Sequence, residues 1–281
     1  MNPSLPPLAE VIRRHRLSAH KSLGQHFLLD ANLTARIVRA AGTLAGRHII
    51  EIGPGPGGLT RALLLAGAQH VTAIERDRRA VAALAELSLS FPGHLTIVSG
   101  NALDVDPVAL TAPPRKIVAN LPYNIATPLL LGWLQNIASY ESLTLMFQKE
   151  VALRLVAKPG GKDYGRLSVM TQWCAEPRLL FDINRRAFVP PPKVTSTVVE
   201  IMPRAAPLAP CARDALERVV AAAFGQRRKM LRAPLKALGV DAAALLRTSG
   251  IASTERAENL TVAQFAALAR AFTRLRGGAA G

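Results

Sequence analysis

The chain has 281 residues, of which 49% are hydrophobic and 19% are charged, and this composition excludes a wholly disordered protein. Its 35 lysines and arginines outnumber its 19 aspartates and glutamates, which gives a net charge of +16 and predicts a polyanionic partner such as nucleic acid. The longest apolar stretches, 62–68 and 129–134, are far shorter than the roughly 18 residues that a membrane-spanning helix needs. A membrane protein is therefore not expected.

The two cysteines, Cys174 and Cys211, are too few for a zinc quartet or a disulfide framework. The basic N-terminal arm, Arg13–Lys21, lacks the apolar core of a secretory signal. We therefore expect a cytoplasmic protein that works in a reducing compartment and holds no metal ion. As a separate expectation, the protein is a monomer.

From about Arg47 to Ile201 the sequence alternates short β-branched runs with longer amphipathic runs, which is typical of a parallel sheet covered by helices. The predicted strands are Arg47–Ile52, His70–Glu75, Leu95–Ser99, Lys116–Ala119, Ser142–Phe147 and Val194–Met202. The predicted helices are Ala31–Ala41 with Asp30 as its N-cap, Leu59–Leu65, Arg79–Leu87 and Pro128–Ile137. The fold class is thus α/β.

The proline-rich segment Pro203–Pro210 interrupts this alternation, and the strand signal ends there. Beyond it, apolar residues recur at helical spacing in Cys211–Phe224 and again in Val262–Leu275. The sequence therefore predicts a sheet-containing domain over residues 1–203 and a small, all-helical C-terminal domain over residues 204–281.

The most informative local stretch is Glu51–Thr60, which reads EIGPGPGGLT, follows a predicted strand and opens a predicted helix. Glycines such as Gly53 and Gly55 let the backbone approach a ligand closely, and the helix N-terminus offers free N–H groups. Glu75 ends the next strand, where its carboxylate can accept hydrogen bonds from both ribose hydroxyls of a nucleoside. Together these features predict a cofactor that contains a nucleoside, whereas the glycines alone would also suit an ordinary tight turn.

The position of Glu51, directly before the glycines, favours S-adenosylmethionine over a nicotinamide cofactor. Methyltransferases place an acid there facing the methionine half, whereas dinucleotide fingerprints usually begin with glycine. A nicotinamide oxidoreductase stays an alternative, but the sequence offers it no proton donor beside a hydride site.

The segment Asn120–Asn124 reads NLPYN and follows the fourth predicted strand, at the edge of the sheet where open α/β sheets bind ligands. The N6 amine of adenine attacks a methyl group poorly, because its lone pair is delocalised into the ring. The Asn120 side-chain oxygen and the Leu121 carbonyl, both accepting from N6–H, would direct that lone pair at a sulfonium methyl. Pro122 stiffens the turn, and Tyr123 can stack on an extruded base. The alternative is a plain strand-to-turn exit with a half-buried tyrosine.

Further segments follow in a characteristic order: KSLGQHFL (Lys21–Leu28), IERD (Ile74–Asp77), FQKEVALRL (Phe147–Leu155), YGRLSV (Tyr164–Val169), FVPPPKVTSTVV (Phe188–Val199), FGQRRKML (Phe224–Leu231) and RAENLT (Arg256–Thr261). Together with EIGPGPGGLT and NLPYN, they resemble the family of small-subunit ribosomal RNA adenine dimethyltransferases, from about Lys21 to Leu275. The resemblance implies a Rossmann-like class I methyltransferase sheet and S-adenosylmethionine as cofactor. It also implies dimethylation of N6 on two adjacent adenosines, in a hairpin loop near the 3′ end of 16S rRNA within an immature small ribosomal subunit.

For the cofactor, the resemblance implies contacts from His26 and Leu28, with Gly53 under the methionine part, Glu75 on the ribose and Asn101 beside the adenine. Asn120 is expected to contact the cofactor as well as the target base. The family usually has Asp where this chain has Asn101, so we expect weaker cofactor binding without its loss. Many members carry Asn where this chain has His26, and a partly buried packing histidine is the alternative interpretation.

For the target base, the resemblance implies that Asn120 and Tyr123 hold the adenine while Phe188 stacks on its other face. Basic residues that would contact RNA follow in the tail: Arg227, Arg228, Lys229, Arg232 and Lys236. Positions 228, 232 and 236 would share one face of a helix, although Pro234 interrupts that face. Arg185 and Arg186, and the N-terminal arm, are further candidates. A solvated charged surface is the alternative.

Two other functions stay open. A large-subunit rRNA methyltransferase would use the same chemistry, but FVPPPKV and the basic FGQRRK stretch favour the small-subunit branch. A protein that keeps the fold but has lost catalysis could serve as an RNA-binding assembly factor, and the presence of Asn120 and Tyr123 argues against it.

Overall fold

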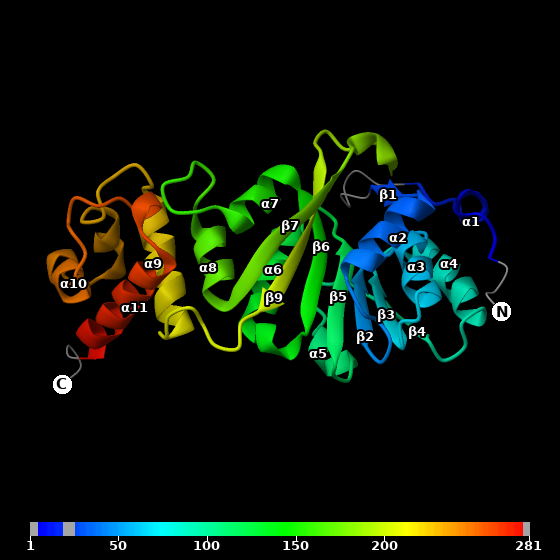
Figure 1. Cartoon of the computed structure of the whole chain (residues 1–281), viewed down its shortest axis with the longest axis horizontal. Helices are drawn as coiled ribbons and strands as arrows, with labels where there is room; N and C mark the ends of the chain where they lie inside the picture. The colour runs from blue at the N-terminus through cyan, green and yellow to red at the C-terminus, as the bar shows by residue number, and fades with distance from the viewer. Residues whose placement is uncertain (1–4, 19–25, 278–281) are drawn as a thin grey trace. The chain divides into compact units, whose positions relative to one another are not determined.

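The computed structural model describes residues 5–18 and 26–277. Figure 1 shows long strands side by side in one part of the chain and a group of helices formed by its C-terminal part. Within the described residues, no helix is both long and apolar enough to cross a membrane.

The chain divides into two compact units. The first comprises Met1–Ala152 and Arg178–Pro203, and the second comprises Leu153–Pro177 and Arg204–Gly281. The first unit ends at Pro203, where the proline-rich segment Pro203–Pro210 begins. Leu153–Pro177 differs from the expectation, because it belongs to the second unit although it precedes the interruption.

A seven-stranded sheet forms the framework of the first unit. Its strands, in spatial order, are β4 (Leu95–Ser99), β3 (His70–Glu75), β2 (His48–Ile52), β5 (Arg115–Asn120), β6 (Ser142–Gln148), β9 (Ser196–Pro203) and β7 (Ala175–Ile183). The strands β4, β3, β2, β5 and β6 are parallel, and β9 is antiparallel to β6. The carboxyl ends of the parallel strands therefore lie at the same edge as the first residues of β9.

The six predicted strands are confirmed as β2, β3, β4, β5, β6 and β9, with ends that differ by at most two residues. The strand β7, at the edge of the sheet, is not predicted by the sequence. Its central residues Arg178–Leu180 are exposed, so it shows neither the continuous apolar run of a buried strand nor a clean alternation.

Helices and 3-10 turns alternate with these strands along the chain. The helices of the first part of the chain are α1 (Leu8–Arg14), α2 (Ala31–Ala40), α3 (Gly58–Leu65), α4 (Arg78–Leu89), α5 (Pro107–Leu110), α6 (Ala126–Trp133) and α7 (Lys149–Val156), with 3-10 turns η2 (Leu134–Ser139) and η3 (Arg185–Ala187). Asp30 caps α2 as predicted, because its side chain accepts from the backbone N of Asn32 at 2.8 Å. The predicted helix Pro128–Ile137 proved to be α6 followed by η2.

The core of the first unit lies between the sheet and the helices. Ile49 of β2 and Val118 of β5 are fully buried, and Leu63 of α3 packs into the same cluster. Burial of each such side chain stabilises the fold by about 1.5–3 kcal/mol. Two short strands, β1 (Phe27–Leu28) and β8 (Phe188–Val189), pair antiparallel beside this core.

The second unit is built from α8 (Arg166–Cys174), α9 (Arg213–Gly225), α10 (Ala242–Ser249) and α11 (Val262–Gly277), with 3-10 turns η4 (Pro234–Leu238) and η5 (Ala257–Asn259). The Phe224 ring stacks on the Phe265 ring, with 5.5 Å between centroids. Helix α8 contacts both α9 and α11, and its Met170 and Trp173 are buried. The apolar side chains of α8 explain why Leu153–Pro177 joins this unit, since periodicity alone does not reveal which partner an apolar face will find.

The predicted basic helix through positions 228, 232 and 236 is wrong. Helix α9 ends at Gly225, residues 226–233 form turns with an isolated β-bridge at Met230, and Pro234 opens η4. A proline at the first position of a helical turn loses no hydrogen bond, so Pro234 starts a new element here instead of interrupting an existing one. Arg228, Arg232 and Lys236 therefore do not lie on one helix face.

Candidate functional site

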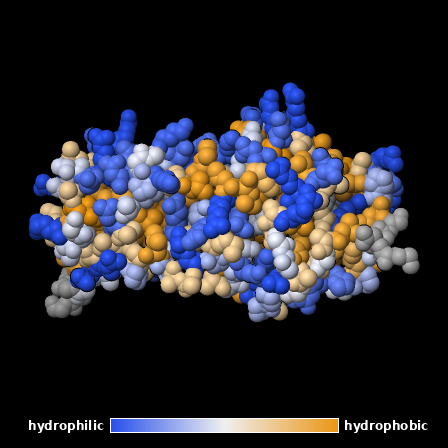
Figure 2. Space-filling view, in the orientation of Figure 1, coloured by the Kyte–Doolittle hydropathy of each residue, from blue (hydrophilic) through white to orange (hydrophobic). Residues whose placement is uncertain are grey.

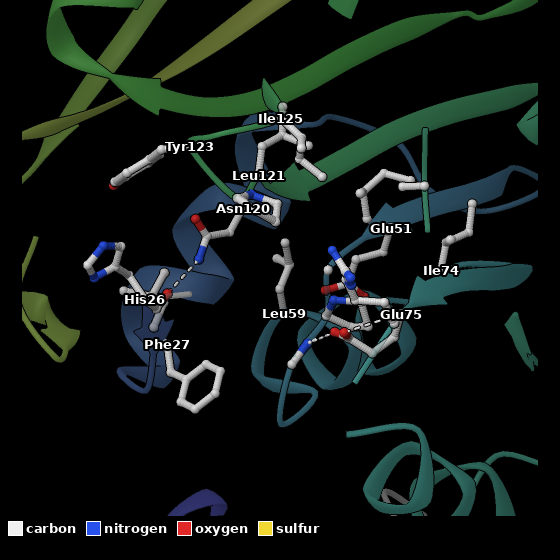
Figure 3. Close-up of a pocket in the computed structure, with 18 of the residues that line it drawn as sticks. His26, Phe27, Glu51, Leu59, Ile74, Glu75, Asn120, Leu121, Tyr123 and Ile125 are labelled. Carbon is white, nitrogen blue, oxygen red and sulfur yellow. Dashed lines mark hydrogen bonds between the residues drawn. The ribbon is translucent and has the colours of Figure 1, made fainter. Parts of the chain in front are cut away.

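A pocket lies at the carboxyl ends of β2, β3, β4 and β5 (Figure 3). It brings together nearly all residues that the sequence analysis assigned to the cofactor and the target base: His26, Leu28, Glu51, Gly53, Gly55, Glu75, Asn101, Asn120, Leu121 and Tyr123. These residues come from separate strands and from the short β1 segment. The sheet topology is what makes them neighbours, because parallel strands end at a common edge.

The glycine loop between β2 and α3 lies tightly against its surroundings. A Cβ on Gly55 would lie 3.0 Å from the Phe27 ring, and one on Gly58 would lie 2.9 Å from the Leu28 carbonyl oxygen. Gly55 also has a φ of +54°, in the left-handed region that favours glycine. The β1 segment therefore packs against the glycine loop more closely than side chains at these glycine positions would allow.

Glu75, at the end of β3, ties the glycine loop to the strand. It is 4% exposed, and its Oε2 accepts from the Gly55 backbone N at 3.0 Å. Its Oε1 accepts from the backbone N atoms of Arg76 and Asp77, at 2.8 and 2.9 Å. Burial raises the pKa of Glu75, and these backbone donors oppose the shift. Sequence reasoning assigned Glu75 to a ribose and missed its second contact, with the loop itself.

Glu51 is the most deeply buried charged group of the pocket, at 1% exposed. Its Oε2 has no hydrogen-bond partner among the described residues. Burial raises the pKa of Glu51 to about 8; the Thr60 hydroxyl opposes this shift and the charge of Glu75 adds to it. A buried carboxyl with a free oxygen is suited to a cationic group, which would restore its charged form.

Asn101 follows β4 and closes a short turn while it lines the pocket. Its Nδ2 donates to Asp104 Oδ2 at 3.0 Å, and its Oδ1 accepts from the Leu103 backbone N over a long 3.4 Å. The proposed contact with an adenine amine would use the same Oδ1, which the long bond leaves weakly engaged. That role stays a prediction.

Asn120 ends β5, and its amide has a defined orientation. Its Nδ2 donates to the His26 carbonyl oxygen at 3.2 Å, so Oδ1 is the atom left to accept from a ligand (Figure 3). Pro122 packs under the glycine loop, since a Cβ on Gly53 would lie 3.2 Å from Pro122 Cγ. The NLPYN segment is thus fixed between the glycine loop and the β1 segment.

His26 and Tyr123 form one side of the pocket (Figure 3). Their ring centroids are 5.4 Å apart, with planes tilted by 33°. His26 Nδ1 lies 2.8 Å from the Pro190 carbonyl oxygen, and it must be the donor because a carbonyl only accepts. The Tyr123 hydroxyl is hydrogen-bonded to the Ser196 hydroxyl. Burial raises the pKa of Tyr123, so the phenol keeps its proton at neutral pH.

Phe188 does not line the pocket, although the resemblance predicts that it stacks on the target base. Phe188 is 1% exposed and packs in the hydrophobic core with Leu28 and Val198, outside the set of described residues that line the pocket. Its backbone pairs with Leu28 in the β1–β8 ladder, which turns the ring towards the core. A sequence motif gives no information on which side of such a short strand a side chain points.

The basic residues of the tail divide into two kinds. Arg227 Nε donates to Glu258 at 3.0 Å and its guanidinium also donates to the Gly161 carbonyl, so it holds the second unit together. Arg228, Lys229 and Arg232 are exposed. Hydrophilic residues are spread across the face shown in Figure 2, interspersed with apolar ones.

The N-terminal arm is described only up to residue 18, so Lys21 lies outside the described residues. Arg14 of this arm is paired with Glu10 and Glu86 on the protein's own surface. Its charge is therefore partly neutralised within the chain.

The strand order, the antiparallel β9 between β6 and β7, and the glycine-loop pocket define a Rossmann-like, class I methyltransferase fold. A solved structure of a dimethyladenosine transferase from Plasmodium falciparum has the same fold, with a TM-score of 0.73, 25% identity, and coverage of 86% of this chain and 96% of that one. The structure of the 23S rRNA methyltransferase ErmE matches with a TM-score of 0.64 and 29% identity, over 89% of this chain and 99% of its own.

The family model for ribosomal RNA adenine dimethylases matches residues 16–274. The chain belongs to this family. A relative from Rhodospirillum rubrum, named ribosomal RNA small subunit methyltransferase A, is 62% identical over 267 residues, which cover 95% of this chain and 92% of the relative.

Proposed function

We propose that the protein is an S-adenosylmethionine-dependent methyltransferase that dimethylates N6 of two adjacent adenosines near the 3′ end of 16S rRNA. The observation that carries this proposal is the orientation of the Asn120 amide, whose Nδ2 is engaged by the His26 carbonyl so that Oδ1 is free to accept in the pocket. Membership of the rRNA adenine dimethylase family and the name of the Rhodospirillum rubrum relative support the choice of substrate.

The pocket residues fit S-adenosylmethionine, which would supply an electrophilic methyl group on a positively charged sulfur. Glu51 is buried with a free Oε2, and a cationic methionine half would compensate its charge. Glu75 has two oxygens with about four acceptor positions, of which three backbone donors use three, so it can still accept from a ribose hydroxyl. Asn101 would accept from the adenine amine.

At the target base, Asn120 Oδ1 and the Leu121 carbonyl would accept the two N6–H groups in the first transfer, and one of them would accept the single remaining N6–H in the second. This arrangement pulls the amine out of conjugation with the ring and directs its lone pair at the methyl carbon. Tyr123 would stack on the extruded base. The proton leaves to water after transfer, so no strong base is needed beside the amine.

The exposed Arg228, Lys229 and Arg232 would contact RNA phosphates, which position the substrate without reading its sequence. Arg227 is not included, because Glu258 already pairs with it. We further propose that the substrate is 16S rRNA within an immature small ribosomal subunit and that the protein acts as a monomer.

The test is incubation of the full chain with labelled S-adenosylmethionine and small subunits that lack the modification, followed by mass spectrometry of the rRNA. Dimethyladenosine at two adjacent positions of 16S rRNA is the expected product. The Asn120→Ala variant, which keeps the pocket, is the control for contaminating activity.

Two outcomes would contradict the proposal. Methylation of 23S rRNA in preference to 16S rRNA would instead favour the large-subunit activity that the likeness to ErmE makes the second candidate. Tight binding of small subunits with no methyl transfer would favour a non-catalytic assembly factor.

A further inference from the structure

The Tyr123 hydroxyl is held by a residue outside the pocket. Its partner is the Ser196 hydroxyl, which is 0% exposed and does not appear among the described residues that line the pocket. Tyr123 itself lines the pocket and is only partly buried. The contact therefore joins a side chain at the target-base end of the pocket to a fixed point in the sheet.

The sheet topology explains how two residues so distant in sequence meet. Tyr123 follows β5, whose last residue, Asn120, lies beside Met146 in β6. Ser196 is the first residue of β9 and lies opposite Gln148 at the end of β6. Because β9 is antiparallel, its beginning lies at the edge where β5 and β6 end, and the hydroxyl contact spans the end of β6.

The position of Ser196 is fixed by its neighbours in the chain. The Thr195 carbonyl accepts from the Lys149 backbone N at 2.9 Å, and Thr197 Oγ1 donates to Asp182 Oδ1 at 2.7 Å. Asp182 in turn accepts from Lys149 Nζ at 2.6 Å. The strand on both sides of Ser196 is thereby held, so its hydroxyl is a rigid anchor.

We propose that Ser196 is a positioning residue for methyl transfer, which acts by fixing the Tyr123 ring through the hydroxyl–hydroxyl contact. This inference rests on the proposed function, in which the Tyr123 ring stacks on the target adenine. Although the NLPYN backbone is fixed, the Tyr123 side chain can still rotate about its Cα–Cβ bond, and a tilt of the stacked base would move N6 away from the methyl carbon. The anchor removes that freedom before the base arrives, which is the preorganisation that oriented reactions require.

The experiment is a double-mutant cycle of Ser196→Ala and Tyr123→Phe in the full-length protein, with unmodified small subunits as substrate. Tyr123→Phe keeps the stacking ring and removes only the hydroxyl. Each single variant is expected to lower kcat for methyl transfer by about tenfold, with the Kd for S-adenosylmethionine unchanged. The double variant should be no slower than the slower single variant, because both changes remove one contact.

The matched control is Thr144→Val, which removes a buried hydroxyl of the neighbouring strand β6 that has no hydrogen-bond partner among the described residues. It should leave kcat unchanged. If Ser196 had a purely structural role, Ser196→Ala would lower Tm, and it would impair kcat and the affinity for S-adenosylmethionine together.

The inference is overturned if Tyr123→Phe transfers methyl groups at the wild-type rate, or if the losses in the two single variants multiply in the double variant. Tyr123→Phe keeps the test decisive should Ser196→Ala fold poorly. Failure of the wild-type protein to methylate 16S rRNA would instead overturn the proposed function, so the two failures are distinguishable.

Discussion

The proposed cofactor end of the pocket, around Glu75, and the proposed target-base end, around Asn120 and Tyr123, are stabilised in different ways. At the cofactor end, Glu75 is bonded to Gly55, Arg76 and Asp77, all within about one strand–helix unit of sequence. At the target-base end, Asn120 is oriented by the His26 carbonyl and Tyr123 by Ser196, which are 94 and 73 residues away in sequence. The first end is a local structure, whereas the second is assembled from distant segments, so damage at a distance should affect the second end more.

The largest effect is expected for Asn120→Ala, which removes the acceptor for N6–H. Methyl transfer should fall by at least about 100-fold, comparable with the loss of a single preorganised group in other active sites. Cofactor affinity should stay within about threefold, because the binding contacts of the cofactor end are local. Single-turnover transfer and equilibrium binding measure the two quantities separately. An equal loss of both would show that the two ends are not distinct.

Glu75→Ala should have the opposite effect. Loss of a buried carboxylate that accepts three backbone N–H groups should weaken S-adenosylmethionine binding by about 10- to 100-fold and lower Tm by several degrees. Glu75→Gln, which keeps one acceptor oxygen, should lose less of both. Calorimetric titration with the cofactor and a thermal scan are the measurements. An unchanged cofactor affinity in Glu75→Ala would contradict the ribose contact.

Glu51→Gln tests the buried charge through pH. The pKa of Glu51 in the folded protein is about 8, above its ordinary 4.5, so this group's contribution to stability is present at low pH and is lost as pH rises from about 4.5 to 8. Without cofactor, the variant should therefore match the wild type near pH 4.5 and exceed its Tm by a few degrees at pH 9. A Tm difference that does not depend on pH would mean that the Glu51 carboxyl does not titrate in this range.

In the same variant, S-adenosylmethionine should bind about tenfold more weakly at pH 9, because the neutral amide cannot compensate a cation. The stability gain of the variant should shrink when saturating cofactor is added to both proteins. If the cofactor binds both proteins equally, Glu51 does not face its cationic part.

The smallest effect is expected for Arg228→Ala and Arg232→Ala, which act outside the pocket. Each should weaken RNA binding several-fold. Each should also reduce the slope of log K against log salt concentration by the contribution of about one phosphate contact. Arg247→Ala, an exposed arginine of α10 in the same unit, is the matched control. Binding titrations at several salt concentrations provide the slope. If all three variants behave alike, the effect is one of net charge and not of a defined RNA contact.

The sequence was a good guide where function depends on a short segment. The glycine loop, Glu75 at the end of its strand and NLPYN at the end of β5 all lie in the pocket, as their positions after predicted strands indicated. Asn101, at the end of β4, was placed in the pocket by resemblance and lies there. These residues share the edge of the sheet, and the order of strands in the chain is enough to locate that edge.

The sequence was a poor guide where a side chain's direction depends on distant contacts. Phe188 is turned into the core by its pairing with the β1 segment, and the loop with Arg228 and Arg232 is not a helix. The anchors of the pocket, Ser196 and the His26 carbonyl, gave no local signal at all. The local sequence does not show which hydrogen-bond partner a buried serine or a backbone carbonyl will have, because the tertiary structure brings that partner from a distant segment.

By itself, the amino-acid sequence determined the α/β architecture and the positions of the glycine loop and of NLPYN directly after their strands. Local backbone preferences and apolar periodicity fix these features, since each involves residues close together in the chain. Only the tertiary structure decided which atom of the Asn120 amide is left to accept a hydrogen bond in the pocket. It also decided how the Tyr123 hydroxyl is held and to which unit Leu153–Pro177 belongs. Those choices depend on hydrogen bonds and packing between segments that meet only after the chain has folded.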